Sequence, residues 1–397
     1  MMDFYQGQEI LLQQSTCMVD TEIVALDLAA GRILAQPLIA VADAPSFDNS
    51  AMDGYAICGL DCPQWQLMGT MAAGDSQQIS LQHGQAVRIY TGAAIPEHTD
   101  AVIMQEHTSV NDNVVTSTHT PIAGDNIRRQ GEELRQGAIL LNKGALLNAQ
   151  AIGLAASQGV SQIEVYQKLR VTVFTTGDEL VNASTALHQH QIYDSNRPML
   201  LACLREHALI ETIDGGILPD NLDIITQTLA QAAKTSHSII ICGGASVGDR
   251  DLVKPALQQL GEIEHWKLAI KPGKPFGWGK IQHCRVMLLP GNPVASFVTF
   301  MLLGLPALQT AAGRHILQAL PECFQARAAF SISPNQQKRR EFIRASIHFS
   351  NNGPEVKPLS KQGSHMLSGC VEAQVLIDIP PQTNIEHGQW LTIYPLK

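Results

Sequence analysis

The chain has 397 residues, of which 45% are hydrophobic and 16% are charged. This composition is typical of a globular protein and excludes a disordered chain, and the length predicts about two to four domains. The formal net charge of −9 excludes a global field that attracts nucleic acid, so any anion site has to be local.

The cysteines and the apolar segments indicate a cytoplasmic protein. None of the eight cysteines forms a C-x-x-C pair, and we expect reduced, mostly packed thiols. Cys58 and Cys62 are neighbours in sequence, but no matching second pair exists, so we expect no metal site there. The N-terminus has no basic region followed by an apolar core, and we expect no apolar run of membrane-spanning length, since "SFVTFMLLGL" is too short.

The first part of the chain predicts a helix, a strand and a short helix in "DLAAGRILAQPL". Over residues 41–142, turn residues separate short runs such as "QAVRIYTG" and "DAVIMQEHTSV", which predicts an inserted β-rich domain. "NAQAIGLAASQG" then predicts a helix that ends at Gly159, followed by the strand "VSQIEVY". We assign residues 1–40 and 143–168 to an N-terminal linking domain, to which the family resemblance described below also gives a role in dimerisation.

Residues 169–313 alternate strands with helices. The apolar runs "LRVTVFTT", "SIIIC" and "RVMLL" predict buried strands of a mostly parallel sheet in an α/β domain. After Gly313 no helix is expected, and alternating segments such as "ARAAFSIS" and "WLTIYPL" predict a small antiparallel barrel or sandwich over residues 314–397, which we assign as a barrel. The fold class is therefore multidomain α/β plus β.

Polar clusters follow each buried strand, at the edge where parallel sheets bind ligands. "TTGDEL" offers Asp178 and Glu179 either as a helix cap or as carboxylates for a metal ion or a substrate hydroxyl. "CGGASVGDRD" predicts a turn whose backbone N–H groups hold an anion. "LPGNPVAS" predicts a turn and a helix N-terminus, which serves as an anion site or as a plain cap.

A lysine-rich loop, "KLAIKPGKPFGWGK", is the strongest candidate for a charged ligand. Its prolines exclude a helix and hold Lys271 and Lys274 close together, and an anion with several charges would compensate their repulsion. A solvated basic loop is the alternative. In the last domain, "KQGSH" offers Ser364 on a glycine turn.

The motifs "FDNSAMDGYA", "TGAAIPE", "TTGDEL", "YDSNRPML", "GGASVGDRD", "KLAIKPGKP", "LPGNPVAS" and "KQGSH" resemble, in order and spacing, those of the MoeA family. The family comprises molybdopterin molybdenumtransferases related to gephyrin and to the plant protein Cnx1. The resemblance covers nearly the whole chain and implies a central MogA-like αβ domain. It also implies that the chain hydrolyses adenylated molybdopterin, releases AMP and inserts molybdate, with Mg²⁺ or Zn²⁺ assisting.

The resemblance further implies a homodimer, with the active site between the αβ domain of one subunit and "FDNSAMDGYA" of the other. The apolar residues Phe47, Met52 and Tyr55 would then anchor this segment to its own domain. Molybdopterin adenylyltransferase and factors that mature molybdoenzymes are expected partners; nucleic acid and membranes are not.

By motif match, four acidic residues are implied to be catalytic, and two of these to hold the metal ion. The catalytic residues are Asp53, Glu179, Asp220 and Asp251, and the metal ligands are Glu179 and Asp251. The residues expected to bind the pterin nucleotide and molybdate are Thr91, Asn196, Gly243, Gly244, Ser246, Lys267, Lys271, Lys274, Pro275, Ser296, Arg344 and Ser364.

One departure from the family pattern concerns the turn before residue 296. The family commonly has serine directly after "GNPV", where this chain has Ala295, so Ser296 would have to supply the hydroxyl. Two competing functions are a molybdopterin adenylyltransferase, which is a short single domain, and a non-enzymatic scaffold such as gephyrin provides. The large regions on both sides of the αβ domain favour the molybdenumtransferase. Adenylation of molybdopterin from ATP would favour the adenylyltransferase. Binding partners found in a pull-down, without any cofactor synthesis, would favour the scaffold.

Overall fold

The computed structural model describes residues 1–244, 252–333, 338–351 and 353–396. It divides into two compact units, each considered by itself. The core unit comprises residues 1–36, 143–152 and 161–397, and the inserted unit comprises residues 37–142 and 153–160. The limits predicted for the inserted β-rich domain lie close to those of the inserted unit. The three other predicted domains fall mainly in the core unit.

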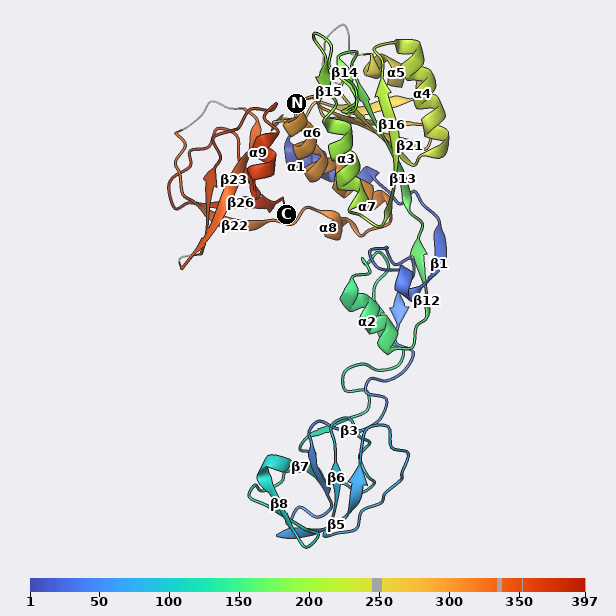
Figure 1. Cartoon of the computed structure of the whole chain (residues 1–397), viewed down its shortest axis with the longest axis vertical. Coiled ribbons are helices and arrows are strands. Elements are labelled where there is room, and N and C mark those ends of the chain that lie inside the picture. Colours follow the sequence, from blue (N-terminus) through green and yellow to red (C-terminus); the bar gives the residue numbers. More distant parts are fainter. Residues whose placement is uncertain (245–251, 334–337, 352, 397) are drawn as a thin grey trace. The chain divides into compact units, whose positions relative to one another are not determined.

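A six-stranded sheet with the order β7-β4-β6-β5-β9-β8 forms most of the inserted unit (Figure 1). Alternate residues of β4 and β6 point to opposite faces, so that Ala56 and Val87 join one apolar cluster while Ile57 and Ala86 join another. The strands are β4 (Gly54–Ile57), β5 (Gln64–Met71), β6 (Gln85–Ile89), β7 (Ala101–Met104), β8 (Thr108–Asn111) and β9 (Val114–Ser117). Two short pairs accompany the sheet: β2 (Leu38–Ile39) with β11 (Ile139–Leu141), and β3 (Asn49–Ser50) with β10 (Ile127–Arg128).

The sheet of the α/β domain has the order β16-β13-β17-β21-β20-β18. The first four strands are parallel to one another, and β20 pairs antiparallel with β21 on one side and with β18 on the other, which confirms the predicted mostly parallel sheet. The strands are β13 (Leu169–Thr176), β16 (Ile210–Leu218), β17 (Ser238–Cys242), β18 (Glu262–Trp266), β20 (Gly277–Ile281) and β21 (Cys284–Leu289). Beside it, β14 (Leu180–Val181) pairs with β15 (Ile192–Tyr193).

Helices cover both faces of this sheet, because its buried strands are apolar on both sides. One face packs against α4 (Leu222–Thr235) and α5 (Val253–Leu260). The other packs against α3 (Asn196–Arg205), the N-terminal α1 (Phe4–Gln14) and the helical segment Pro293–Ala311.

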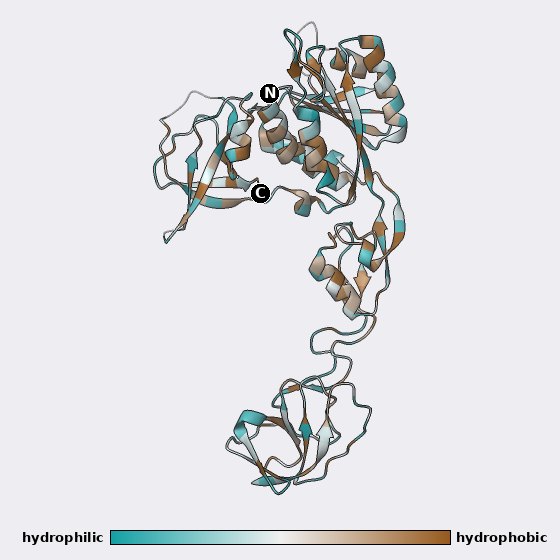
Figure 2. Ribbon diagram, viewed as in Figure 1, coloured by the Kyte–Doolittle hydropathy of each residue, from teal (hydrophilic) through white to brown (hydrophobic). Residues whose placement is uncertain are grey.

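The segment Pro293–Ala311 consists of α6 (Pro293–Thr299), the π-helical turn η3 (Phe300–Gly304) and α7 (Leu305–Ala311). By length and composition it is long enough to cross a membrane, which corrects the expectation that no apolar run reaches that length. However, 89% of its most apolar window is buried inside the protein. Its apolar surface, brown in Figure 2, therefore belongs to the core of the α/β domain.

The linking part of the chain has one helix fewer than expected. Strand β1 (Thr21–Ala25) pairs with β12 (Gln162–Tyr166), and α2 (Ala149–Ser157) precedes Gly159 as predicted. The helix predicted in "DLAAGRILAQPL" is wrong: only the 3₁₀ turn η1 (Leu26–Leu28) forms. Gly31 adopts a positive φ of 75°, and Ile33 and Leu34 then form β-bridges instead.

A closed five-stranded barrel ends the chain, which confirms the predicted barrel; it is not wholly antiparallel, because β22 and β24 pair in parallel. Its strands pair in the ring β23-β24-β22-β26-β25-β23. They are β22 (Phe324–Ala328), β23 (Arg340–Ser350), β24 (Gly353–Pro358), β25 (Val375–Ile379) and β26 (Trp390–Pro395). The short strand β19 (Ile270–Lys271) of the lysine loop pairs in parallel with the start of β23. The expectation of no helix after Gly313 is wrong, since α8 (Ile316–Ala319) and α9 (Ser368–Glu372) are present.

Candidate active site

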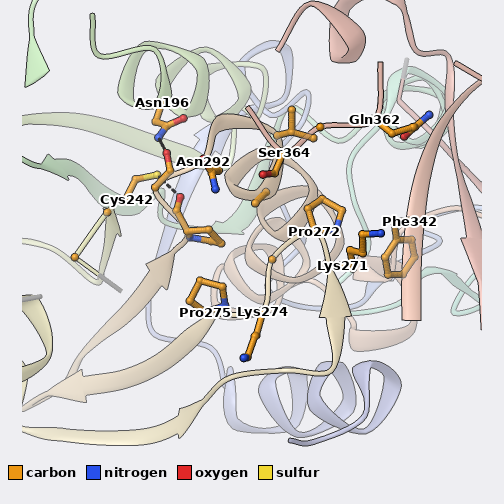
Figure 3. A pocket seen from close by; sticks show the side chains of 18 of the residues that line it. Asn196, Cys242, Lys271, Pro272, Lys274, Pro275, Asn292, Phe342, Gln362 and Ser364 are labelled. Carbon is orange, nitrogen blue, oxygen red and sulfur yellow. Dashed lines mark hydrogen bonds between the residues drawn. The ribbon is translucent and has the colours of Figure 1, made fainter. Parts of the chain in front are cut away.

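A cavity of about 850 Å³ lies where β13, β17 and β21 end. The loops after these strands line it together with the lysine loop and two segments of the barrel (Figure 3). Nine predicted site residues lie on its wall: Glu179, Asn196, Gly243, Gly244, Lys271, Lys274, Pro275, Arg344 and Ser364. Ser246 and Asp251 lie outside the described residues. The prediction that parallel strand ends gather these motifs agrees with this geometry.

Two glycines form the turn after β17. Gly243 and Gly244 have φ values of +100° and +59°, which glycine adopts without strain. A Cβ atom on Gly243 would lie 2.7 Å from the carbonyl oxygen of Thr176, and one on Gly244 would lie 2.5 Å from Val253 Cγ2. Any side chain here would therefore push the turn away from β13, so the sequence "GG" keeps backbone atoms on the cavity wall.

Glu179 reaches the cavity because its side chain folds back over a glycine. A Cβ atom on Gly177, whose φ is +146°, would lie 2.5 Å from Glu179 Oε2. Asp220 is not on the wall, but it accepts a hydrogen bond from the wall residue Thr176 (Oγ1 to Oδ1, 3.1 Å). The backbone N–H of Asp220 in turn donates to Asp178 Oδ1 at 3.0 Å. Among these acidic residues, only Glu179 lies on the wall.

Asn196 presents an unused acceptor at the start of α3. Its Nδ2 donates to the carbonyl oxygen of Gly291 at 2.7 Å, whereas its buried Oδ1 has no hydrogen-bond partner in the described part of the chain. A buried amide oxygen without a partner is costly, so a ligand that donates to it gains affinity.

An ion network that sequence reasoning missed fixes the position of α3. The buried Asp194 accepts hydrogen bonds from Thr175 Oγ1 (2.7 Å) and Arg197 Nε (3.0 Å), and Arg197 also pairs with Asp214 at 2.6 Å. Burial opposes the charge on Arg197, but the hydrogen bonds to Asp214 and Asp194 outweigh it and raise the pKa of Arg197. The signal was present in "YDSNRP", because Asp194 and Arg197 are three residues apart across a helix start.

Ser296 lies behind the cavity wall. It is fully buried and its Oγ lies 3.0 Å from Cys242 Sγ, while Ala295 lines the cavity in its place. Successive residues of a helix point about 100° apart, which turns Ser296 inward when Ala295 faces the ligand. Burial raises the pKa of the Cys242 thiol to about 12, so this pair is neutral.

The lysine loop is partly neutralised by the protein itself. Lys271 Nζ lies 2.8 Å from Glu341 Oε1 of β23, a compensating carboxylate that sequence reasoning did not anticipate. Lys274 has no ion pair with any described residue, and in Figure 3 its ammonium group points away from that of Lys271. Gly273 seats the loop on α6, since a Cβ there would lie 2.3 Å from Thr299 Cγ2. Lys267 is not among the wall residues.

Arg344 organises the barrel loop that carries Ser364. Its side chain is almost fully buried, with Nη1 donating to Met366 O (2.8 Å) and Nη2 to Gly363 O (3.1 Å). Gln362 is another wall residue that was not predicted. Its Oε1 accepts a hydrogen bond from the N–H of Arg344, and its Nε2 donates one to the carbonyl oxygen of Arg344. The carbonyl of Ser364 accepts from the N–H of Val294 at the start of α6, so this loop closes onto the α/β domain.

Asp53 and Thr91 belong to the inserted unit, where they form a pair. Asp53 Oδ1 accepts hydrogen bonds from the backbone N–H and the hydroxyl of Thr91, both at 2.8 Å. The N–H bond, followed by the hydroxyl bond, lowers the pKa of Asp53, so this exposed carboxylate stays ionised.

The expectation that Phe47 and Met52 anchor the segment before β4 is wrong, because their exposed fractions are 48% and 41%. Polar groups hold the segment instead. Asn49 Nδ2 donates to Phe47 O at 3.2 Å and Ser50 Oγ donates to Met52 O at 2.6 Å. Asn49 and Ser50 are buried here, and of the three predicted apolar anchors only the half-buried Tyr55 packs against an apolar cluster.

Three family models match successive parts of the chain. They are the MoeA N-terminal region (domain I and II) at residues 2–159, a probable molybdopterin binding domain at residues 172–310, and the MoeA C-terminal region (domain IV) at residues 325–396. Over 100% of its length, the chain is 38% identical to a Haemophilus influenzae protein named molybdopterin molybdenumtransferase, of which it covers 99%. The chain belongs to the molybdopterin molybdenumtransferase family.

Two other similar proteins agree with this assignment. A molybdopterin biosynthesis MoeA protein from Pyrococcus horikoshii OT3 has the same fold, with a TM-score of 0.84 and 28% identity over 100% of both chains. Gephyrin from Dictyostelium discoideum is 31% identical over 91% of this chain and 57% of its own length. The resemblance seen in the motifs is therefore confirmed. The cavity lies between the segment matching the molybdopterin binding domain and that matching the MoeA C-terminal region.

Proposed function

We propose that this chain inserts molybdate into adenylated molybdopterin and releases AMP, which yields molybdenum cofactor. The observation that carries the proposal is the single cavity shared by the strand-end turns, the lysine loop and the barrel loop. Its volume suits a ligand of the size of a pterin nucleotide.

Different residues of the cavity wall would bind different parts of the substrates, according to their chemistry. The turn at Gly243 and Gly244 admits a phosphate close to the backbone. Asn196 lines the cavity, and its buried Oδ1, which lacks a partner in the described chain, would accept a hydrogen bond from an N–H group of the pterin once the side chain turns toward the ligand. Lys274 supplies the positive charge that a molybdate dianion needs.

A divalent cation, Mg²⁺ or Zn²⁺, is part of the proposal. The Glu179 carboxylate fits such an ion, because it is exposed on the wall beside the phosphate turn and one or two carboxylates plus phosphate oxygens suffice for Mg²⁺. The bound ion would neutralise charge on the phosphate that leaves as AMP. Glu179, positioned by Gly177, would hold it; Asp251 is the second proposed ligand and lies outside the described residues.

We also propose a homodimer in which Asp53 completes the site of the partner subunit. The support is local: Asp53 is an exposed, oriented carboxylate, and the exposed apolar side chains of Phe47 and Met52 lie in the same segment. A molybdopterin adenylyltransferase would supply the substrate, because the adenylated pterin is its product.

Reconstitution tests the proposal. The chain is mixed with adenylated molybdopterin, molybdate and Mg²⁺, and AMP release is followed together with activation of an apo-molybdoenzyme. We expect AMP release that depends on molybdate, and its loss in Glu179→Gln. Equal AMP release without molybdate and without cofactor formation would contradict the proposal. A chain that adenylates the pterin from ATP would instead be an adenylyltransferase.

A further inference from the structure

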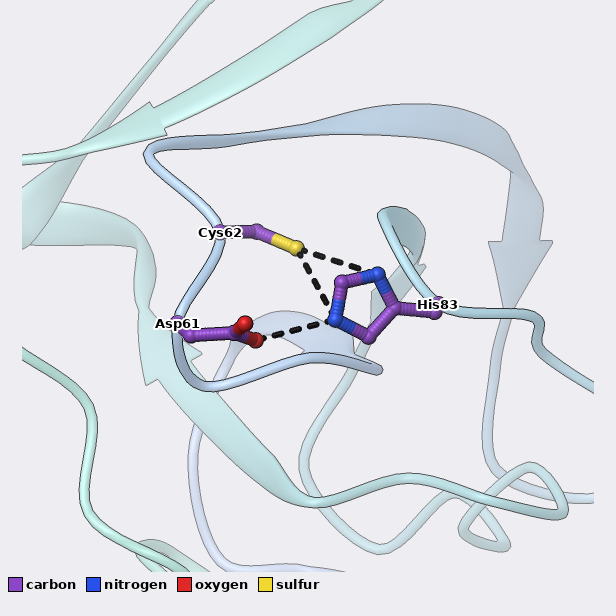
Figure 4. A group of neighbouring side chains, drawn as sticks. All are labelled: Asp61, Cys62 and His83. Atoms are coloured by element: carbon purple, nitrogen blue, oxygen red, sulfur yellow. Dashed lines mark hydrogen bonds and ion pairs between the residues drawn. The ribbon is translucent and has the colours of Figure 1, made fainter.

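Three potential metal ligands meet on the surface of the inserted unit, in a place that the proposed function does not use. Asp61, Cys62 and His83 each offer one ligand atom, and these atoms all lie within 4.8 Å of one another (Figure 4). Cys62 Sγ lies 3.6 Å from His83 Nδ1 and 3.7 Å from Nε2, and Nε2 lies 2.9 Å from Asp61 Oδ1.

These separations fit tetrahedral coordination. Zinc bonds of about 2.3 Å to sulfur and about 2.0 Å to nitrogen place the two ligand atoms about 3.6 Å apart. Because Sγ is nearly equidistant from the two ring nitrogens, each nitrogen lies within the span that a shared zinc ion bridges. The exposed Asp61 carboxylate needs to move by less than about 1 Å to become the third ligand.

A glycine backbone forms the seat under this cluster. Gly59 has a φ of +96°, and a Cβ atom there would lie 2.7 Å from Cys62 Sγ and 2.9 Å from His83 Cδ2. Both side chains therefore pack directly over the backbone of residue 59. The absence of a side chain at this position is what allows them to converge.

The two loops that carry the ligands are also fixed to each other. The N–H of Gly84 donates to Cys58 O at 2.9 Å, which ties the His83 loop to the turn after β4. The turn is held at Gly59, whose N–H donates to Asp100 Oδ2 at 2.7 Å and whose carbonyl accepts from Nε1 of the buried Trp65 at 2.9 Å. The frame is thus rigid although the ligating side chains are accessible, which favours a preorganised site.

The donor set selects the type of metal. A thiolate and an imidazole favour Zn²⁺ over Mg²⁺, which prefers oxygen ligands. Three protein ligands leave the fourth position to water, and such an open, accessible site exchanges its metal more readily than a closed structural site with four protein ligands.

We infer that Asp61, Cys62 and His83 form an exchangeable zinc site on the inserted unit. The site lies at one end of the paired strands β4 and β6, and Asp53 and Thr91 lie at the other end. Zinc there would join the turn after β4 to the loop before β6. This role is independent of the proposed reaction, since none of the three residues belongs to the cavity.

The test uses the full-length chain, freed of metal with a chelator and kept reduced. Zn²⁺ is titrated calorimetrically in excess Mg²⁺, and Co²⁺ is added in parallel as a spectroscopic probe. We expect one Zn²⁺ per chain at this site and a thiolate-to-cobalt charge-transfer band. Cys62→Ser and His83→Ala should each remove that equivalent and the band, and Asp61→Asn should weaken binding at least about tenfold.

Cys58→Ser is the matched control, because Cys58 is a neighbouring thiol outside the cluster and the substitution should leave zinc binding unchanged. Circular dichroism verifies that each variant is folded, and the exposed positions of Asp61 and His83 make this the expected result. Zinc stoichiometry that is the same in Cys62→Ser, His83→Ala and the unmodified chain would overturn the inference. So would loss of the site in Cys58→Ser, or a cobalt spectrum without the thiolate band. AMP release is not part of this test, so its outcome is separate from that of the proposed function.

Discussion

Lys274 differs from Lys271, which lies three residues before it in the same loop, in having its charge available. Lys271 is paired with Glu341, whereas Lys274 lies on the wall without an ion pair in the described chain. A charge-assisted hydrogen bond contributes about 1.5–3 kcal/mol, so Lys274→Ala should raise the molybdate concentration for half-maximal cofactor formation about ten- to a hundredfold. Molybdate titrations of cofactor formation measure this, and high molybdate should restore part of the activity.

Lys280→Ala is the control for this prediction, because Lys280 ends the same lysine-rich stretch but pairs with Glu262 and is absent from the wall. It should leave the molybdate dependence within about twofold of the unmodified chain. AMP affinity is measured in both variants. An unchanged molybdate dependence with a collapse of AMP affinity in Lys274→Ala would place the nucleotide, and not the oxyanion, at this loop.

At the scale of elements, a polar network joins α1 to the barrel. Tyr5 donates to Asp378 Oδ2 at 2.6 Å, and Arg340 Nη1 donates to both oxygens of the buried Asp378 at 2.7 and 2.8 Å. Asp378→Asn leaves the largely buried Arg340, whose side chain is 14% exposed, without its counter-charge, so we expect a loss of about 3 kcal/mol in the free energy of unfolding, measured in urea. Glu372→Gln, which removes the exposed ion pair with Lys361, should cost at most about 1 kcal/mol. Equal costs for both would refute a buried role for Asp378.

The same network predicts a pH dependence. Burial, followed by the hydrogen bond to Asp378, raises the pKa of Tyr5 above its ordinary value of 10.0. The folded protein then keeps the Tyr5 proton where the unfolded chain releases it, so stability present below pH 10 declines as the pH rises further. In Tyr5→Phe this part of the decline should vanish, as measured by urea midpoints at about pH 8 and about pH 10.5. If the urea midpoint of Tyr5→Phe changed with pH as much as that of the unmodified chain, Tyr5 would not be the source of the pH dependence.

The sequence predicted the features that depend on neighbouring residues and missed those that depend on contacts between distant segments. The β13, β17 and β21 strands and their glycine turns were predictable, because apolar runs and glycines are local signals. The inward turn of Ser296, the pairing of Lys271 with Glu341 and the exposure of Phe47 were not, because each depends on packing between distant segments. Likewise, Cys62 and His83 meet only through the pairing of β4 with β6.

For the whole molecule, the proposed homodimer makes a complementation prediction. Asp53→Ala and Glu179→Ala alter different units of the chain, so mixed subunits would contain one site with both carboxylates intact. After co-refolding, the mixture should regain up to about a quarter of the unmodified AMP release, because half the dimers are mixed and each has one complete site. Each variant refolded alone gives the baseline. A mixture no more active than either baseline, or a fully active monomer in sedimentation, would exclude a shared site.

The contact of Ser364 O with the Val294 N–H has a thermodynamic consequence. The cavity wall is assembled from segments separated by more than a hundred residues, and it is complete only when the barrel loop is seated on α6. A ligand that binds this wall binds only chains in which both domains are folded and docked. Occupancy therefore couples the unfolding of the barrel to that of the α/β domain. It should make the two domains melt as one cooperative unit.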